Sequence, residues 1–128
     1  MHTSLADQLF SVSSSVRYVA VYRGGNLEMR QRPGIADASA AESDRYEELI
    51  VNPTLLTLTT QRGNIDCGGI QYLLIRYGSF FQFVCPLPDG HVSVALEPGS
   101  APLDLVPALL RIVGASQAGA DGMRYRAT

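Results

Sequence analysis

The sequence predicts an α/β (α+β) domain built on a single five-stranded antiparallel sheet, in the order helix, two strands, helix, three strands, helix. Two observations indicate this fold class. A β-branched and aromatic segment meets a tight turn at Gly24-Gly25, and three further apolar segments follow one another between residues 70 and 97 with short turns between them. Segments with helical spacing flank and separate these two groups of strands, which is typical of one sheet covered by helices.

Composition limits the function classes. The 128 residues fit one domain that can bury a core without staples. The net charge is -2, so nucleic-acid binding is not expected, because it needs clustered Lys and Arg. All basic residues are arginine, which excludes a P-loop. Cys67 and Cys85 fit no zinc spacing, and no metal or other cofactor is expected. Without a signal peptide or a long apolar run, we expect a cytoplasmic protein with reduced thiols and no membrane insertion.

The first helix and the first hairpin are the clearest local predictions. Leu5 and Leu9 share one face of a short amphipathic helix, with Thr3 or Ser4 as its cap. A strand over residues 16–23 then turns at Gly24-Gly25, which supply positive φ, into a half-exposed edge strand over residues 26–32.

The central segment, residues 35–64, is ambiguous. Ser39 followed by Glu42 resembles a capping box, and helical spacing follows it through Ile50. Pro53 interrupts that pattern, since a proline inside a helix loses a backbone hydrogen bond. Residues 54–62 have strand-like composition but also fit one helical face. We favour a helix kinked at Pro53 and ended by Gly63-Asn64.

Three strands and a helix complete the domain. The strands are predicted over residues 70–77, 80–87 and 91–97, and the first is apolar enough to be covered on both faces. Asp104 is expected to cap the last helix, with Pro107 in its first turn. The domain is therefore expected to span residues 1–113, and the small and polar residues 114–128 to form a disordered tail.

This order resembles the roadblock (dynein light-chain) family of small domains with a profilin-like fold. Three stretches carry the resemblance. "VRYVAVYRGGNLEMR" is similar to the family's first hairpin, "QYLLIRYGSFFQFVCPLPDGHVSVAL" to its three-strand meander, and "LDLVPALLRIV" to its closing helix. The chain departs from the family in having Pro53 within the central helix and the glycine-rich "NIDCGGI" before the third strand.

The resemblance implies a non-catalytic binding module. Such domains form homodimers through their central helices and edge strands, and serve small Ras-like GTPases or signalling complexes as scaffolds or regulators. An open apolar edge at the third strand would otherwise be prone to aggregation. The expected interface lies on the central helix and the third strand: Tyr46, Leu49, Ile50, Leu55, Leu56, Tyr72 and Leu74. The alternatives are a profilin-like or sensor-like domain that binds a small molecule and a cysteine-dependent enzyme.

Cys67, within "DCGG", is the candidate nucleophile for such an enzyme. A reactive cysteine needs a base, and His91 is the histidine available outside the N-terminal residues. The predicted topology does not bring the two together, so a structural thiol is favoured over catalysis, redox sensing or metal binding. Cys85 is expected to be a core residue of its strand.

Two charged groups have alternative interpretations. One comprises acidic residues at the start of the central helix. We interpret them as the solvated first turn of the helix in preference to a site for a cation or a basic partner: Glu42, Asp44, Glu47 and Glu48. The other comprises arginines of the first hairpin. We interpret them as charges that keep an exposed edge strand soluble, in preference to a patch for an acidic partner: Arg17, Arg23, Arg30 and Arg32.

Overall fold

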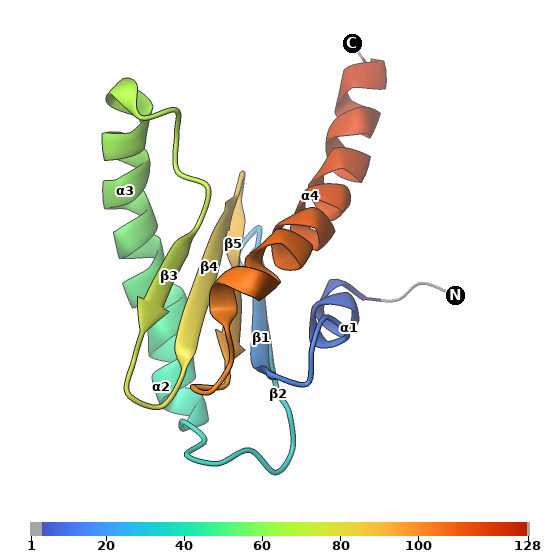
Figure 1. The fold of residues 1–128 in the computed structure, drawn as a ribbon. Helices are drawn as coiled ribbons and strands as arrows, with labels where there is room; N and C mark the ends of the chain where they lie inside the picture. The colour runs from blue at the N-terminus through green and yellow to red at the C-terminus, as the bar shows by residue number, and fades with distance from the viewer. Residues whose placement is uncertain (1–3, 128) are drawn as a thin grey trace.

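The computed structural model describes the backbone of residues 4–127 and the side chains of residues 4–117. One five-stranded antiparallel sheet has the strand order β2-β1-β5-β4-β3 (Figure 1). Its strands are β1 (Val16–Arg23), β2 (Asn26–Gln31), β3 (Leu73–Arg76), β4 (Phe81–Leu87) and β5 (Gly90–Leu96). The helices are α1 (Leu5–Phe10), α2 (Ala41–Tyr46), the π-helical turn η1 (Glu47–Val51), α3 (Asn52–Asp66) and α4 (Pro102–Ala127). The predicted fold class and element order are confirmed.

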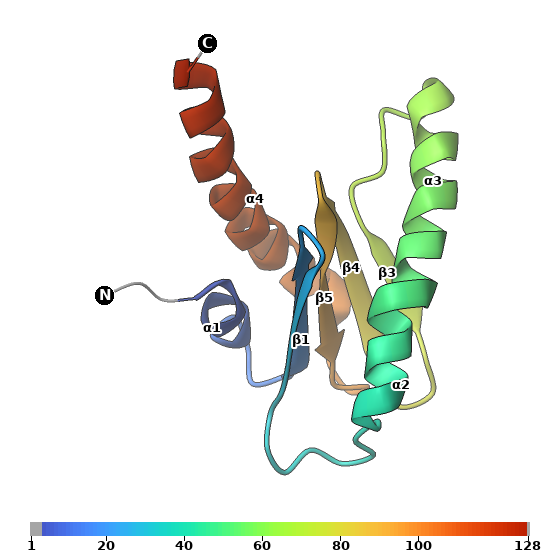
Figure 2. The ribbon, with the colours of Figure 1, turned by 180° about the vertical axis from the view of Figure 1, so that it is seen from behind.

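The sheet separates two helical layers. Figures 1 and 2 show α1 and α4 on one face and the continuous run α2-η1-α3, here called the central helix, on the other. The main apolar core lies between the sheet and α1 and α4, where Leu9 and Leu109 pack with Phe83. Under the central helix the apolar cluster is smaller and is built around Tyr18 and Ala20. The central helix therefore rests on a thinner layer that has room for polar groups.

The turns follow the sequence, but one edge strand is shorter than predicted. Gly24 and Gly25 have φ values of 55° and 81°, which glycine adopts freely, and they close the β1–β2 hairpin. At the other edge, β3 pairs with β4 only through Leu73–Arg76. The strand predicted over residues 70–77 is thus wrong at both ends. Residues 70–72 form the connection that returns from the end of α3 to the sheet.

The central helix passes Pro53 without a break. Helix at residues 54–62 is confirmed, and the expected kink is replaced by η1, whose wider hydrogen-bonded turn accommodates a residue that has no N–H. The expected capping box is also wrong. Ala40 is the N-cap and contributes no side-chain hydrogen bond, while the hydroxyl of Ser39 donates to Asp44.

The helix ends at Asp66 and not at Gly63. Gly63 is buried, and its carbonyl accepts the N–H groups of Cys67 and Gly69 at 3.1 and 3.0 Å. Gly68 has a φ of 78°, so the chain reverses through a glycine in the left-handed conformation just past the end of the helix. "DCGG" is therefore a helix C-terminus that leads back to the sheet.

The last helix differs from its prediction at both ends. It begins at Pro102, so Asp104 lies in its first turn and Pro107 lies inside the helix. Val106, Leu109 and Val113 are buried against the core. The helix continues to Ala127, across residues for which a disordered tail is expected, and the domain limit at residue 113 stays a prediction. No described helix is both long and apolar enough to cross a membrane.

Candidate functional site

The outer face of the central helix carries a line of exposed apolar side chains. Tyr46, Ile50, Leu58 and Ile65 are 61, 51, 60 and 75% exposed. We call these four residues the outer stripe. Among the described side chains, the other large hydrophobic residue with comparable exposure is Leu103 on α4. Several large apolar side chains exposed along one helix indicate a surface that a partner covers.

The π turn aligns the stripe. In a regular α-helix, residues four apart drift steadily around the axis, because a turn holds 3.6 residues. The π turn takes more residues per turn and offsets that drift between Tyr46 and Leu58. The opposite face of the helix is buried along its length at Glu48, Asn52 and Leu56. One face is thus fixed against the sheet and the other presents the stripe.

The seven residues predicted as an interface divide between the two faces of the sheet. Tyr46 and Ile50 belong to the stripe, whereas Leu56 is buried beneath the helix. Tyr72 and Leu74 pack against the core cluster on the α1 and α4 side. The other two, Leu49 and Leu55, are half-buried flanks of the central helix.

Sequence reasoning missed Leu58 and Ile65. Both residues lie in the segment that was ambiguous between helix and strand or just after it. Their alignment with Tyr46 depends on the π turn, which has no signature in the residues around Pro53.

A buried polar network lies under the π turn. The Glu48 carboxylate is fully buried and is reached by three groups: the Tyr18 hydroxyl at 2.8 Å, Asn52 Nδ2 at 3.0 Å and His91 Nε2 at 2.8 Å. Burial, followed by the charge of Glu48, raises the pKa of the Tyr18 phenol. The amide oxygen Oδ1 of Asn52 is buried without a hydrogen-bond partner among the described residues. The network joins the central helix to β1 and β5.

The acidic residues of the central helix do not form the solvated first turn that was favoured. Of the four, Glu42 is clearly solvated. Glu47 accepts the Tyr77 hydroxyl at 3.2 Å, while Asp44 accepts the hydroxyl of Ser39. Burial raises the pKa of both Asp44 and Glu47, and the neighbouring Glu48 adds to the shift. These carboxylates turn toward the sheet and do not form an open cation site.

The arginines of the first hairpin do not form a free patch either. Arg17 is 3% exposed, and its guanidinium donates to the carbonyls of Ser79 and Ala36 and pairs with Glu97 at 3.2 Å. Arg32 is half-buried and donates to the Val16 carbonyl. The expectation that these arginines lie on an exposed strand edge is therefore wrong for Arg17 and Arg32, whose side chains bind backbone carbonyls instead. Arg30 is exposed but pairs with Asp7 at 2.6 Å.

The two residues considered for thiol chemistry have separate partners. Cys67 is exposed at the end of α3, and its thiol donates to Asp66 at 3.4 Å. His91 is buried and bound to Glu48. Within the described residues, the hydrogen bonds of Cys67 include no basic side chain. Cys85 is buried in β4, as predicted.

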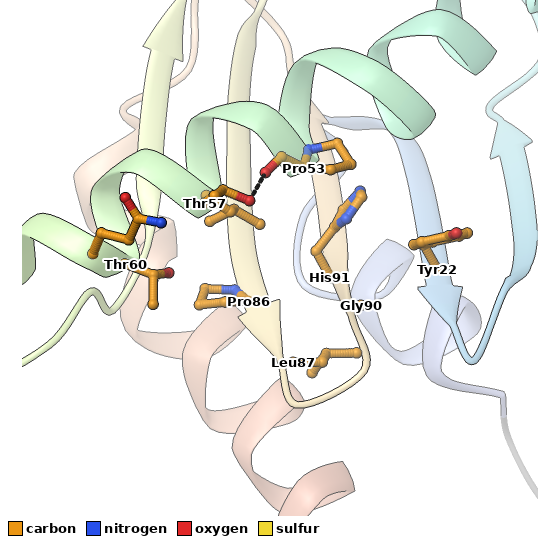
Figure 3. A pocket seen from close by; sticks show the side chains of 10 residues that line it. Tyr22, Pro53, Thr57, Thr60, Pro86, Leu87, Gly90 and His91 are labelled. Atoms are coloured by element: carbon orange, nitrogen blue, oxygen red, sulfur yellow. Dashed lines mark hydrogen bonds between the residues drawn. The ribbon is translucent and has the colours of Figure 1, made fainter. Parts of the chain in front are cut away.

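A groove opens beside His91, between α3 and the ends of β1, β4 and β5 (Figure 3). Its volume is about 420 Å³. Pro53 and Thr57 of α3 lie on one side, and Tyr22 and Pro86 of the sheet lie on the other. The His91 ring lines the groove and contacts the Tyr22 ring, with 5.7 Å between the centroids. The groove has the size of a small-molecule site.

Comparison with known proteins supports the fold. No family model and no curated protein sequence matches the chain. Among solved structures, the chain is similar to the gliding protein MglB from Thermus thermophilus, with a TM-score of 0.54 and 9% sequence identity. The match covers 88% of this chain and 93% of the MglB chain. At this identity the likeness establishes a shared fold.

Proposed function

We propose that this chain is a non-catalytic, homodimeric scaffold or regulatory module that binds a small Ras-like GTPase or a related signalling partner. The observation that carries the proposal is the outer stripe. Four large apolar side chains stand exposed in one line on a helix whose opposite face is fixed by a buried network. Fully burying one such side chain contributes about 1.5–3 kcal/mol, so covering the stripe favours association strongly.

A second copy of the chain is the partner that fits the stripe most simply. In a two-fold dimer the same patch meets itself, so an apolar line on one helix meets an apolar line on the other. The edge of β3 is open and offers unpaired backbone groups to the same edge of the partner. The proposed interface is therefore the outer stripe with Leu49 and Leu55 at its flanks, and the β3 edge near Tyr72 and Leu74.

The proposal of a GTPase partner rests on similarity to other proteins. The resemblance to the roadblock family and the fold shared with MglB both support a role in assembling or regulating such a protein. A cytoplasmic location is part of this proposal. The test is to mix the chain with a Ras-like GTPase from the same genome, loaded with GDP or with a GTP analogue, and to measure binding and nucleotide hydrolysis. Binding that depends on the nucleotide supports the proposal, and no binding in either state refutes this part of it.

The dimer is tested separately by measuring the mass in solution over a range of about 1 to 100 µM, the affinities of ordinary specific complexes. A dimer is expected across this range. A monomer at the upper concentration would refute the homodimer, whatever the outcome with the GTPase.

A second candidate function, a sensor-like domain that binds a small molecule, is favoured by one observation. The groove beside His91 has ligand size and lies next to the central helix.

A further inference from the structure

The groove beside His91 has a lining that selects one class of ligand. We infer that it binds an uncharged ring compound of low polarity. Such a ligand belongs to the sensor-like candidate function, on which this proposal rests, and it requires neither the dimer nor a GTPase partner. The charge of the lining, its few free hydrogen-bond donors and its rigid walls all favour this class.

The buried part of the groove is mostly apolar and its rim is polar. The lining residues that are buried are Leu56, Leu87 and His91, whereas Thr57 and Gln61 are exposed. Among the described residues that line the groove, none is Asp, Glu, Lys or Arg. Organic cations need a carboxylate or an aromatic cage, and phosphate or carboxylate groups need cationic groups or several N–H donors. A charged ligand would therefore lose its hydration here without gaining a counter-charge.

The His91 ring does not make the groove an anion site in either of its protonation states. If both ring nitrogens carry a proton, the positive charge is compensated by the Glu48 carboxylate, whose Oε1 atom lies 2.8 Å from Nε2. If the ring is neutral, the buried pair carries the negative charge of Glu48. In neither state does the pair present a net positive charge to a ligand, so an anion is not favoured.

The groove offers few free hydrogen-bond donors. Pro53 on the helix side and Pro86 on the sheet side have no N–H group. The Thr57 hydroxyl donates to the Pro53 carbonyl at 2.8 Å. A strongly polar ligand would give up hydrogen bonds to water that these walls do not replace. An apolar ligand gives up none, and it buries its surface against Leu56 and Leu87.

The walls of the groove are rigid. Figure 3 shows Pro53 on the helix, and Pro86, His91 and Tyr22 on the sheet. All four side chains contain a ring, and the rings of Tyr22 and His91 contact each other at an angle of 43°. Walls of this kind are in place before a ligand arrives. A ring compound also has few rotors to freeze, so the entropic cost of binding is small.

The test compares 3-propylindole, tryptamine and indole-3-acetate, which share a ring system and have short side chains that end in a methyl group, an ammonium and a carboxylate. Each compound is titrated at about pH 7 into the full, ¹⁵N-labelled chain, and amide shifts are followed by NMR. Saturable shifts are expected at Tyr22, Leu87 and Gly90 with 3-propylindole. This compound should bind at least about tenfold more tightly than either charged one.

Two results would contradict the proposal, and they are distinguishable. Equal or tighter binding of a charged compound at the groove amides would overturn the ligand class but leave the groove as a small-molecule site. With about 1 mM 3-propylindole, shifts that lie elsewhere or no shift at these amides would overturn the groove as its site and remove the support for the sensor-like function.

A matched pair of variants locates the site. Thr57→Phe places a bulky side chain in the groove, and Thr54→Phe makes the same change one turn earlier, where the side chain is exposed. Each threonine hydroxyl donates to the carbonyl four residues before it, so the local cost of the two changes is similar. Thr57→Phe should abolish binding of 3-propylindole with the NMR spectrum still dispersed, and Thr54→Phe should retain it. Unchanged binding to Thr57→Phe would contradict the site.

Discussion

The carboxylate of Glu48 and the imidazole of His91 meet at 2.8 Å across the boundary between the central helix and the sheet, 43 residues apart in the chain. Glu48 is midway between Tyr46 and Ile50 in the sequence. On a helix, residues two positions away point to roughly the opposite side. By holding Glu48 against the sheet, the buried network therefore turns Tyr46 and Ile50 outward. The orientation of the central helix on the sheet therefore places the polar contact beneath the helix and exposes the outer stripe.

Removing the Glu48 carboxylate should destabilise the fold severely. Glu48→Ala leaves the Tyr18 hydroxyl, the Asn52 amide and the His91 ring buried without their acceptor. Loss of one member of such a buried group costs about 3 kcal/mol or more. Urea unfolding gives the free energy of unfolding for comparison with Glu42→Ala, an exposed residue of the same helix that should change it by less than about 0.5 kcal/mol. If the two variants lost similar amounts of unfolding free energy, the buried network would not be what stabilises the fold.

Gly90 should not tolerate a side chain. A Cβ at this position would lie 1.8 Å from the backbone carbonyl oxygen of Tyr22, so β1 and β5 would have to separate. Gly90→Ala is expected to cost about 1–3 kcal/mol, measured by thermal or urea unfolding. Gly99 serves as the control because a Cβ there meets nothing within 4 Å. If Gly90→Ala were as stable as Gly99→Ala, the close approach of the two strands would be wrong.

Glu47 should make stability depend on pH. Burial, together with Glu48 and Asp44, raises the pKa of Glu47 above its ordinary value of 4.5, although the Tyr77 hydrogen bond opposes the shift. The folded state then holds this proton more tightly than the unfolded chain. The contribution of Glu47 to stability is therefore present below pH 4.5 and is lost as the pH rises through the raised pKa.

The substitution Glu47→Gln isolates this contribution. It keeps an acceptor for Tyr77 and removes the charge. The variant should be more stable than the wild type at about pH 7, and the advantage should disappear near pH 4, where the carboxyl is protonated in both states. An advantage that stays constant between these two pH values would show that the charge of Glu47 is not the cause.

The two cysteines should differ in reactivity. Cys67 is exposed, whereas burial raises the pKa of the Cys85 thiol to about 11. A disulfide reagent at about pH 8 should therefore modify one thiol per folded chain quickly, and the second only after unfolding in urea. In Cys67→Ser the fast phase should vanish without loss of stability. A fast phase that survives this substitution would mean that Cys85 is accessible.

Local patterns were sufficient for most of the fold. The Gly24-Gly25 turn, the three closing strands and the presence of the last helix follow from residue spacing and turn chemistry, because each depends on neighbours in the sequence. Expectations about polar residues were less successful. Arg17 and Glu48 looked like surface charges, since burial of such groups depends on partners such as Ser79 and His91 that only the tertiary fold supplies.

The π turn explains the largest difference between the interface predicted from the sequence and the candidate site in the structure. From the sequence, Pro53 predicts a kink, and residues 54–62 suit either helix or strand. The structure absorbs the proline in the wider turn, which brings Leu58 and Ile65 into line with Tyr46. The face of β3 that meets the central helix is set by the tertiary fold and not by the residues of the strand. Tyr72 and Leu74 therefore lie against the other layer.

Whether the outer stripe is a homodimer interface is tested by the mass of three proteins at about 20 µM, measured by sedimentation equilibrium. They are the wild type, Leu58→Arg in the stripe and Leu103→Arg on α4, two leucines of similar exposure on opposite faces of the sheet. The wild type and Leu103→Arg should be dimers, and Leu58→Arg a folded monomer. A monomeric wild type, or a Leu58→Arg variant that remains a dimer, would show that the outer stripe is not a homodimer interface.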